Sequence, residues 1–242
     1  MDVIRLLAPA LMFAAIATPV SADVTLQSKR TETHGDAGSR IIDTTEYRKG
    51  VRIRTDQSGG DITSVSTIVD AGTGRLVTLW HAGKIADVFD LTKKPAVPDR
   101  GGVPEFKQSI TPTGRSRQIA GSTCAVYDFK SSVRYPEMER DGAVIMVVEG
   151  SMCLVKDGPG QAEFSAVYRA YRAQSAFDAM VQVRPEMTEL GVPFATQMTL
   201  RMGGDAMTKE VTSSTTEVIS VSTAPIPDAI FEIPADYRVI QR

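Results

Sequence analysis

The sequence predicts a mainly β protein in which one antiparallel sheet, of about ten or more strands, covers one helical region. Three observations support this fold class. Short segments that alternate apolar and polar residues recur through the first half, separated by glycine turns. A long Val- and Ile-rich hairpin follows, and it contains both cysteines of the chain. A single stretch, from Gln161 to Val183, has the apolar spacing of a helix.

The first half of the chain predicts a meander of about six short strands. These strands cover Val24–Thr33, Arg40–Tyr47, Val51–Thr55, Ile62–Asp70, Arg75–His81 and Lys84–Leu91. Such a sheet has an apolar face that needs a partner layer. The Pro- and Gly-rich stretch Thr92–Gln108 is interpreted as a long loop within one domain that spans residues 23–242.

The hairpin between Gly121 and Lys156 predicts a disulfide bond. Pairing Val133 with Val144 places Cys124 opposite Cys153, and cysteines on neighbouring strands can reach bonding distance. A structural crosslink of this span stabilises a fold by roughly 3–4 kcal/mol. A redox-active pair is the less favoured reading, because the chain has no Cys-x-x-Cys motif. In this register the cysteines lie on the face opposite a set of apolar residues, namely Tyr127, Phe129, Val133, Val144, Met146, Val148, Met152 and Leu154.

The last third predicts a helix followed by strands. Phe164, Val167, Tyr168 and Tyr171 follow the i, i+3, i+4, i+7 rule, and a second apolar stripe after them is rotated. We therefore expect a bend near residues 173–176, and a helix end at Pro185. Further strands are expected at Phe194–Met202 and Met207–Thr223.

The N-terminus has the pattern of a signal peptide over residues 1–22. Arg5 precedes a nearly continuous apolar run, Leu6 to Ile16, and small residues stand at Val20-Ser21-Ala22. Cleavage is expected between Ala22 and Asp23. The apolar run is too short to span a bilayer, and no later segment is long enough either. The predicted location is periplasmic or secreted, where a disulfide can form.

Two motifs resemble a family of exported bacterial domains of unknown function. They are the segment Ile119–Tyr127, with its Gly-x-x-Cys entry, and the ending Pro227–Tyr237, which follows Gly191-Val192-Pro193 and two strands. In layout this family is similar to the LolA/LolB-like lipoprotein carriers. The resemblance implies a half-barrel, in which a strongly curved antiparallel sheet wraps over helices with an apolar cavity between them. The chain departs from the carriers in having one helical region instead of several.

Candidate catalytic residues do not emerge from the sequence. His34 and His81 have no partner at metal-ligand spacing, and the chain lacks Gly-x-Ser-x-Gly and phosphate-loop motifs. We therefore expect no metal and no cofactor. The net charge of −2 does not favour nucleic acid as a partner.

A binding function fits these features better than catalysis. The hypothesis is a non-enzymatic protein that binds a lipid, an acyl chain or a lipidated protein in a concave apolar cavity. The expected lining, which an ordinary packed core would equally use, comprises Trp80, Phe89, Tyr127, Phe129, Val148, Met152, Phe164, Met198 and Leu200. The alternatives are an interaction or sensor domain with a filled core, and an undetected hydrolase. The sequence leaves the oligomeric state open.

Overall fold

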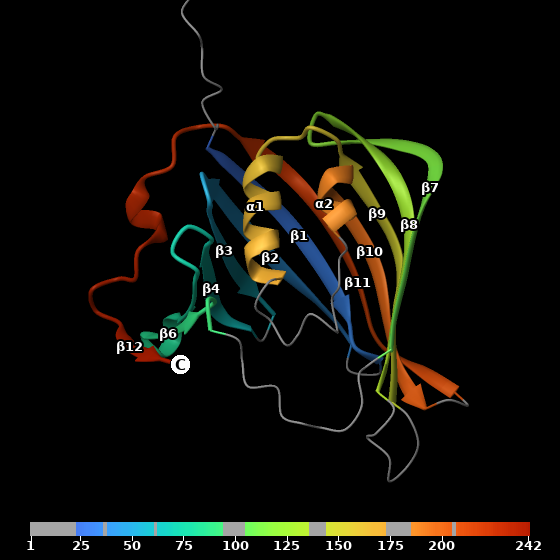
Figure 1. Cartoon of the computed structure of the whole chain (residues 1–242), viewed down its shortest axis with the longest axis horizontal. Coiled ribbons are helices and arrows are strands. Elements are labelled where there is room, and N and C mark those ends of the chain that lie inside the picture. Colours follow the sequence, from blue (N-terminus) through green and yellow to red (C-terminus); the bar gives the residue numbers. More distant parts are fainter. Residues whose placement is uncertain are drawn as a thin grey trace, which may run out of the picture.

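The computed structural model describes residues 23–35, 38–60, 62–93, 105–135, 144–172, 185–204 and 207–242. Within these residues the chain forms one twelve-stranded sheet that curves around two short helices (Figure 1). The predicted fold class, a mainly β curved antiparallel sheet over one helical region, is confirmed. The predicted signal peptide lies outside the described residues, so its cleavage between Ala22 and Asp23 stays a prediction.

The first six strands occur in the predicted order and close to their predicted positions. The later elements differ in length from the predicted ones. The strands are β1 (Val24–Thr33), β2 (Ser39–Lys49), β3 (Arg52–Gly59), β4 (Ile62–Asp70), β5 (Arg75–Trp80), β6 (Ile85–Asp90), β7 (Glu105–Ile119), β8 (Ser122–Tyr135), β9 (Val144–Val155), β10 (Val192–Gly204), β11 (Met207–Ser222) and β12 (Arg238–Gln241). The helices are α1 (Gln161–Arg172) and α2 (Pro185–Leu190), with short 3-10 turns at His81–Gly83 and Asp228–Phe231.

The strand order is β12-β6-β5-β4-β3-β2-β1-β11-β10-β9-β8-β7. Two antiparallel meanders, β1–β6 and β7–β11, therefore meet where β1 pairs with β11. The last strand, β12, pairs in parallel with β6 and was not predicted. The pairing of β1 with β11 joins the two meanders into one sheet. It gives hydrogen-bond partners to backbone N–H and C=O groups that two separate sheets would leave exposed at their edges.

Helix α1 lies against one face of the sheet, which we call the inner face (Figure 1). Arg48 of β2 is 2% exposed and reaches α1, where its guanidinium lies 5.1 Å from the centre of the Phe164 ring. Its Nη1 also donates to the carbonyl of Gly160, the residue before the helix, at 3.3 Å. These contacts attach the start of α1 to the middle of the sheet.

Pro185 begins helix α2, which was not predicted, and the predicted end of the earlier helix lies outside the described residues. Proline fits the first turn of a helix, because the amide hydrogens there have no intrahelical acceptor. The predicted bend at residues 173–176 lies outside the described residues.

Strands β8 and β9 pair two residues away from the predicted register. Cys153 lies opposite Val126, so the two cysteines are diagonal neighbours, with Cα atoms 5.2 Å apart and their sulfurs bonded. A shift of two residues keeps every side chain on its predicted face. It also places Lys130 directly opposite Glu149, where the two form an ion pair at 3.2 Å. A long connection between the strands constrains register less than a tight turn does.

The disulfide is buried near the turn that connects β7 to β8. Cys124 is 0% exposed and belongs to the largest apolar cluster, together with Ile119 at the end of β7. Arg117 of β7 forms an ion pair with Glu217 of β11 at 2.6 Å, although three strands separate β7 from β11 in the sheet. The hairpin end therefore bends back over the outer face toward β11. Figure 1 shows the strong curvature of β7 and β8.

Removing the disulfide should destabilise this bent edge. The bond joins residues 29 positions apart, and the chain-entropy model gives roughly 3–4 kcal/mol for that span. We expect the C124A/C153A double variant to lose about this much free energy of unfolding in urea. Wild-type protein measured with a reductant should approach the variant. A loss below about 1 kcal/mol in both would contradict a stapling role.

Candidate functional site

A cavity of about 540 Å³ lies between α1 and the strands β7–β11 on the inner face. Its volume is within the roughly 300–1,000 Å³ of small-molecule sites. Helix α1 forms one wall with Phe164 and Tyr168, and strands β8, β9 and β10 form the opposite wall. The helix and the sheet curvature together create this space, because the sheet bends around α1 (Figure 1).

Six of the nine residues expected from the sequence line this cavity. They are Phe129, Val148, Met152, Phe164, Met198 and Leu200. Register explains why they converge: Leu200 pairs with Val148, and these strand positions share the inner face. The lining is predominantly apolar, and two methionines give it side chains that adapt to ligand shape. A role for these residues in ligand binding stays a prediction.

The other three expected residues lie elsewhere. Tyr127 packs beside Met152 in a neighbouring cluster, next to the cavity rather than on its wall. Trp80 and Phe89 share the inner face but stand on β5 and β6, where they are 45% and 38% exposed. Helix α1 contacts β2, β3 and β4, so it stands between these two aromatic residues and the cavity. The strand order, which the sequence did not show, separates them.

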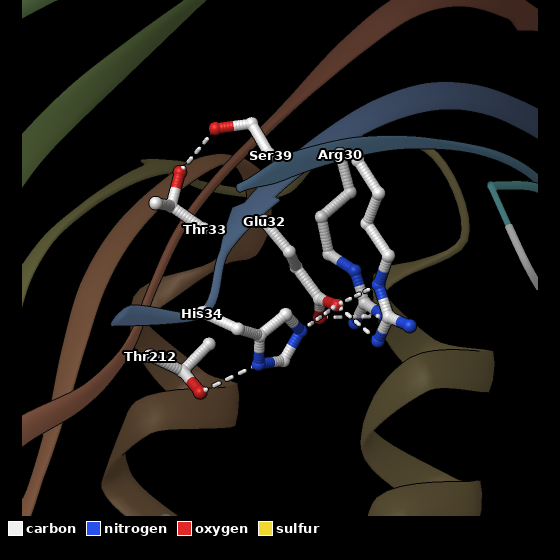
Figure 2. Close-up of polar contacts among 7 residues, drawn as sticks. Arg30, Glu32, Thr33, His34, Ser39 and Thr212 are labelled. Carbon is white, nitrogen blue, oxygen red and sulfur yellow. Dashed lines mark hydrogen bonds and ion pairs between the residues drawn. The ribbon is translucent and has the colours of Figure 1, made fainter. Parts of the chain in front are cut away.

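One end of the cavity is polar, and Glu32 is its centre (Figure 2). The carboxylate is buried and accepts hydrogen bonds from Arg40 Nε at 2.9 Å and Arg40 Nη2 at 2.6 Å. Arg30 Nη2 lies 2.9 Å from its other oxygen. His34 Nε2 lies 3.3 Å from the carboxylate, and its other ring nitrogen lies 3.1 Å from the Thr212 hydroxyl.

The surroundings of Glu32 keep its pKa below the ordinary value of 4.5. Burial is the largest single influence and on its own raises the pKa, because it disfavours a charged carboxylate. The hydrogen bond from Arg40 and the positive charges of Arg30 and Arg40 together outweigh it, with a further contribution from His34. Glu32 is therefore ionised at neutral pH and holds the two arginines in place.

This polar group was not predicted from the sequence, where His34 was considered only as a possible metal ligand. A signal was available in the alternation of β1. Arg30 and Glu32 have the same parity as Val24 and Leu26, which are buried. Charges that continue an apolar face indicate a polar site on the inside of the fold. Only the sheet pairing brings Arg40 and Thr212 to the same place.

A chain of hydrogen bonds joins Ser66, His81 and Tyr237 on the outer face. The Ser66 hydroxyl lies 2.6 Å from His81 Nε2, and His81 Nδ1 contacts the Tyr237 hydroxyl. A serine–histidine pair can serve as a nucleophile and base. Ser66, however, is 1% exposed, and Tyr237 packs on the apolar cluster beneath the C-terminal tail. The arrangement ties that tail to β4 and offers a substrate no access to the serine.

Within the described residues, no three His, Cys, Asp or Glu side chains lie together as a metal site would require. The same part of the chain contains no helix with the length and apolar character needed to cross a membrane.

Comparisons with known proteins return a structural likeness. No protein-family model matches the chain, and no curated protein matches it. A crystal structure of a LolA superfamily protein, NE2245 from Nitrosomonas europaea, is similar over 90% of this chain and 92% of that chain. The identity is 10% and the TM-score is 0.32. At this identity and TM-score the likeness supports no conclusion about the family or the ligand of this chain.

Neutralising Glu32 should destabilise the fold in a pH-dependent way. E32Q leaves two arginines close together without a counter-charge, so we expect a loss of about 3 kcal/mol in the free energy of unfolding at pH 7. The lowered pKa means that the ionised carboxylate stabilises the fold above pH 4.5, and that this contribution disappears as pH falls through the folded-state pKa. The difference in free energy of unfolding between wild type and E32Q should therefore disappear at acid pH.

D43N is the matched control, because Asp43 has a 63% exposed side chain and pairs only loosely with Lys29, at 3.8 Å. D43N should lower the free energy of unfolding by less than about 1 kcal/mol at every pH. Urea unfolding at several pH values measures all three proteins. A gap for E32Q that does not change with pH would contradict the assigned ionisation.

Proposed function

We propose that this protein is an exported, non-enzymatic binding protein that holds an apolar ligand in the cavity between α1 and the sheet. The ligand class is a lipid, an acyl chain or the acyl part of a lipidated protein. The observation that carries the proposal is the cavity itself, at about 540 Å³ and with six predicted apolar residues on its wall. Apolar ligands gain free energy by leaving water for such a lining.

Export is supported by two independent features. The N-terminal sequence has the basic start, apolar run and small-residue site of a signal peptide. Both cysteines of the chain are joined in a buried disulfide, which is typical of proteins that fold outside the reducing cytosol. An exported carrier of apolar molecules would meet its ligand at or near a membrane surface.

The alternative function, an interaction or sensor domain, expects a filled core, and the cavity favours ligand binding over it. Its remaining support is that Trp80 and Phe89 are both exposed on the inner face of β5 and β6, where they lie opposite Ile85 and Leu76. Exposed apolar side chains on one face of a sheet can belong to a contact surface. If W80S/F89S abolished capture of a partner while V148W did not, the interaction function would be favoured.

Filling the cavity tests the proposal directly. Val148 lies on the cavity wall, so V148W places an indole where the ligand would lie. We expect native mass spectrometry of detergent-free periplasmic protein to show a ligand adduct on the wild type and none on V148W. The affinity for a fluorescent fatty acid should fall by about ten-fold or more, which corresponds to about 1.4 kcal/mol.

V147W is the control, because the neighbouring residue on a strand points to the opposite face. It adds the same side chain to the same strand, and it should keep both the adduct and the affinity. Equal binding by wild type and V148W, with both proteins folded by circular dichroism, would overturn the cavity as the binding site.

A further inference from the structure

The polar end of the cavity has more positive than negative charge. Arg30 and Arg40 contribute two guanidinium groups, and Glu32 contributes one carboxylate. All three lie on the inner face, since Glu32 pairs with Arg40 across β1 and β2, and Arg30 follows the same alternation. The group as a whole therefore has a net positive charge beside an apolar space. The two arginine side chains are partly buried, at 26% and 35% exposed, and an anion at this place would offset their net charge.

The two arginines also have donors that Glu32 does not use. Each guanidinium has five N–H donors. Among the described residues, Glu32 accepts one hydrogen bond or ion pair from Arg30 and two hydrogen bonds from Arg40. Arg30 Nε is buried and has no hydrogen-bond partner in the described part of the chain. Buried donors are usually paired in native proteins, so Arg30 Nε is available to an acceptor at this place.

The remaining donors border both spaces on the inner face. Arg40 and His34 line the main cavity, whereas Arg30 lines an adjoining hollow of about 310 Å³. Phe164, Thr196 and Met198 line both spaces, so the two are neighbours. An anionic group at the end of the main cavity would thus meet Arg40 first, with Arg30 behind it. Arginine suits this role because its planar group binds carboxylate and phosphate with paired hydrogen bonds.

We propose that the ligand is an anionic amphiphile, with its chain along Phe129, Val148 and Leu200 and its carboxylate or phosphate group at Arg40 and Arg30. This inference deepens the proposed function and depends on it. Glu32 positions the two arginines and does not bind the ligand. His34, anchored to Thr212, closes the polar end on the β11 side (Figure 2). A cationic head group would be repelled at this end, so the site selects by charge as well as by apolarity.

Three probes separate the possible ligands: hexadecanoic acid, hexadecanol and inorganic phosphate. Each is titrated at pH 8 against the protein freed of ligand, with displacement of a fluorescent acyl probe as the readout. We expect the acid to bind about ten-fold more tightly than the alcohol, since charge-assisted hydrogen bonds to the head group are present only in the acid. Phosphate alone should displace nothing, because it lacks the chain.

R40M should lower the affinity for the acid to that for the alcohol and leave the alcohol unchanged. R117M is the matched control: Arg117 also pairs with a glutamate, Glu217, but on the outer face, so its loss should change neither affinity. R30M provides a second variant at the site. If neither site variant folds, the comparison of acid with alcohol on the wild type still decides the inference.

Equal affinities of wild type for acid and alcohol would overturn the charge selection and leave the apolar cavity function standing. Displacement by phosphate alone, at the acid's affinity, would show a site for free anions and overturn the amphiphile. A folded, ligand-free wild type that bound neither the acid nor the alcohol would contradict the proposed function along with the inference.

Discussion

The contact between Arg48 and the start of α1 is the constraint on which the site depends. Arg48 is almost fully buried and binds the Gly160 carbonyl while its guanidinium covers the Phe164 ring. Gly160 has a φ of +70°, and a Cβ there would lie 2.8 Å from Arg48 Cδ, so only glycine fits without strain. Glu46 balances the buried charge. With α1 held over β2, the inner face is divided into two unequal parts.

The larger part contains the cavity, which lies between α1 and the strands β8–β10. The β7–β8 hairpin folds its end over the outer face, and the Cys124–Cys153 bond together with the Arg117–Glu217 ion pair holds it there. The smaller part, beyond α1, carries Trp80 and remains open among the described residues. One helix position thus decides which inward-facing aromatic residues share a cavity and which meet solvent. Packing on both faces is what makes an otherwise open sheet hold a defined curvature.

The cavity is apolar along most of its wall and polar at one end. Apolar residues of β8–β10 form most of the wall, and the Glu32 group closes one end. A carboxylate that holds two arginines keeps them ordered without neutralising them fully, so the site is preorganised before a ligand arrives. An amphiphile would enter such a space in one orientation only.

The local sequence pattern determined where most of the strands and the first helix lie. Alternation and glycine turns located the strands of the first meander, β-branched content located the cysteine hairpin, and apolar spacing located α1. The inward face of β8 and β9 was predicted correctly even though the register was not, because a two-residue shift preserves the face. Tertiary structure alone decided which distant strands adjoin: it paired β12 with β6, placed α1 between Trp80 and the cavity, and brought Thr212 to His34. These contacts join residues far apart in the chain, and their energies depend on packing that no local periodicity encodes.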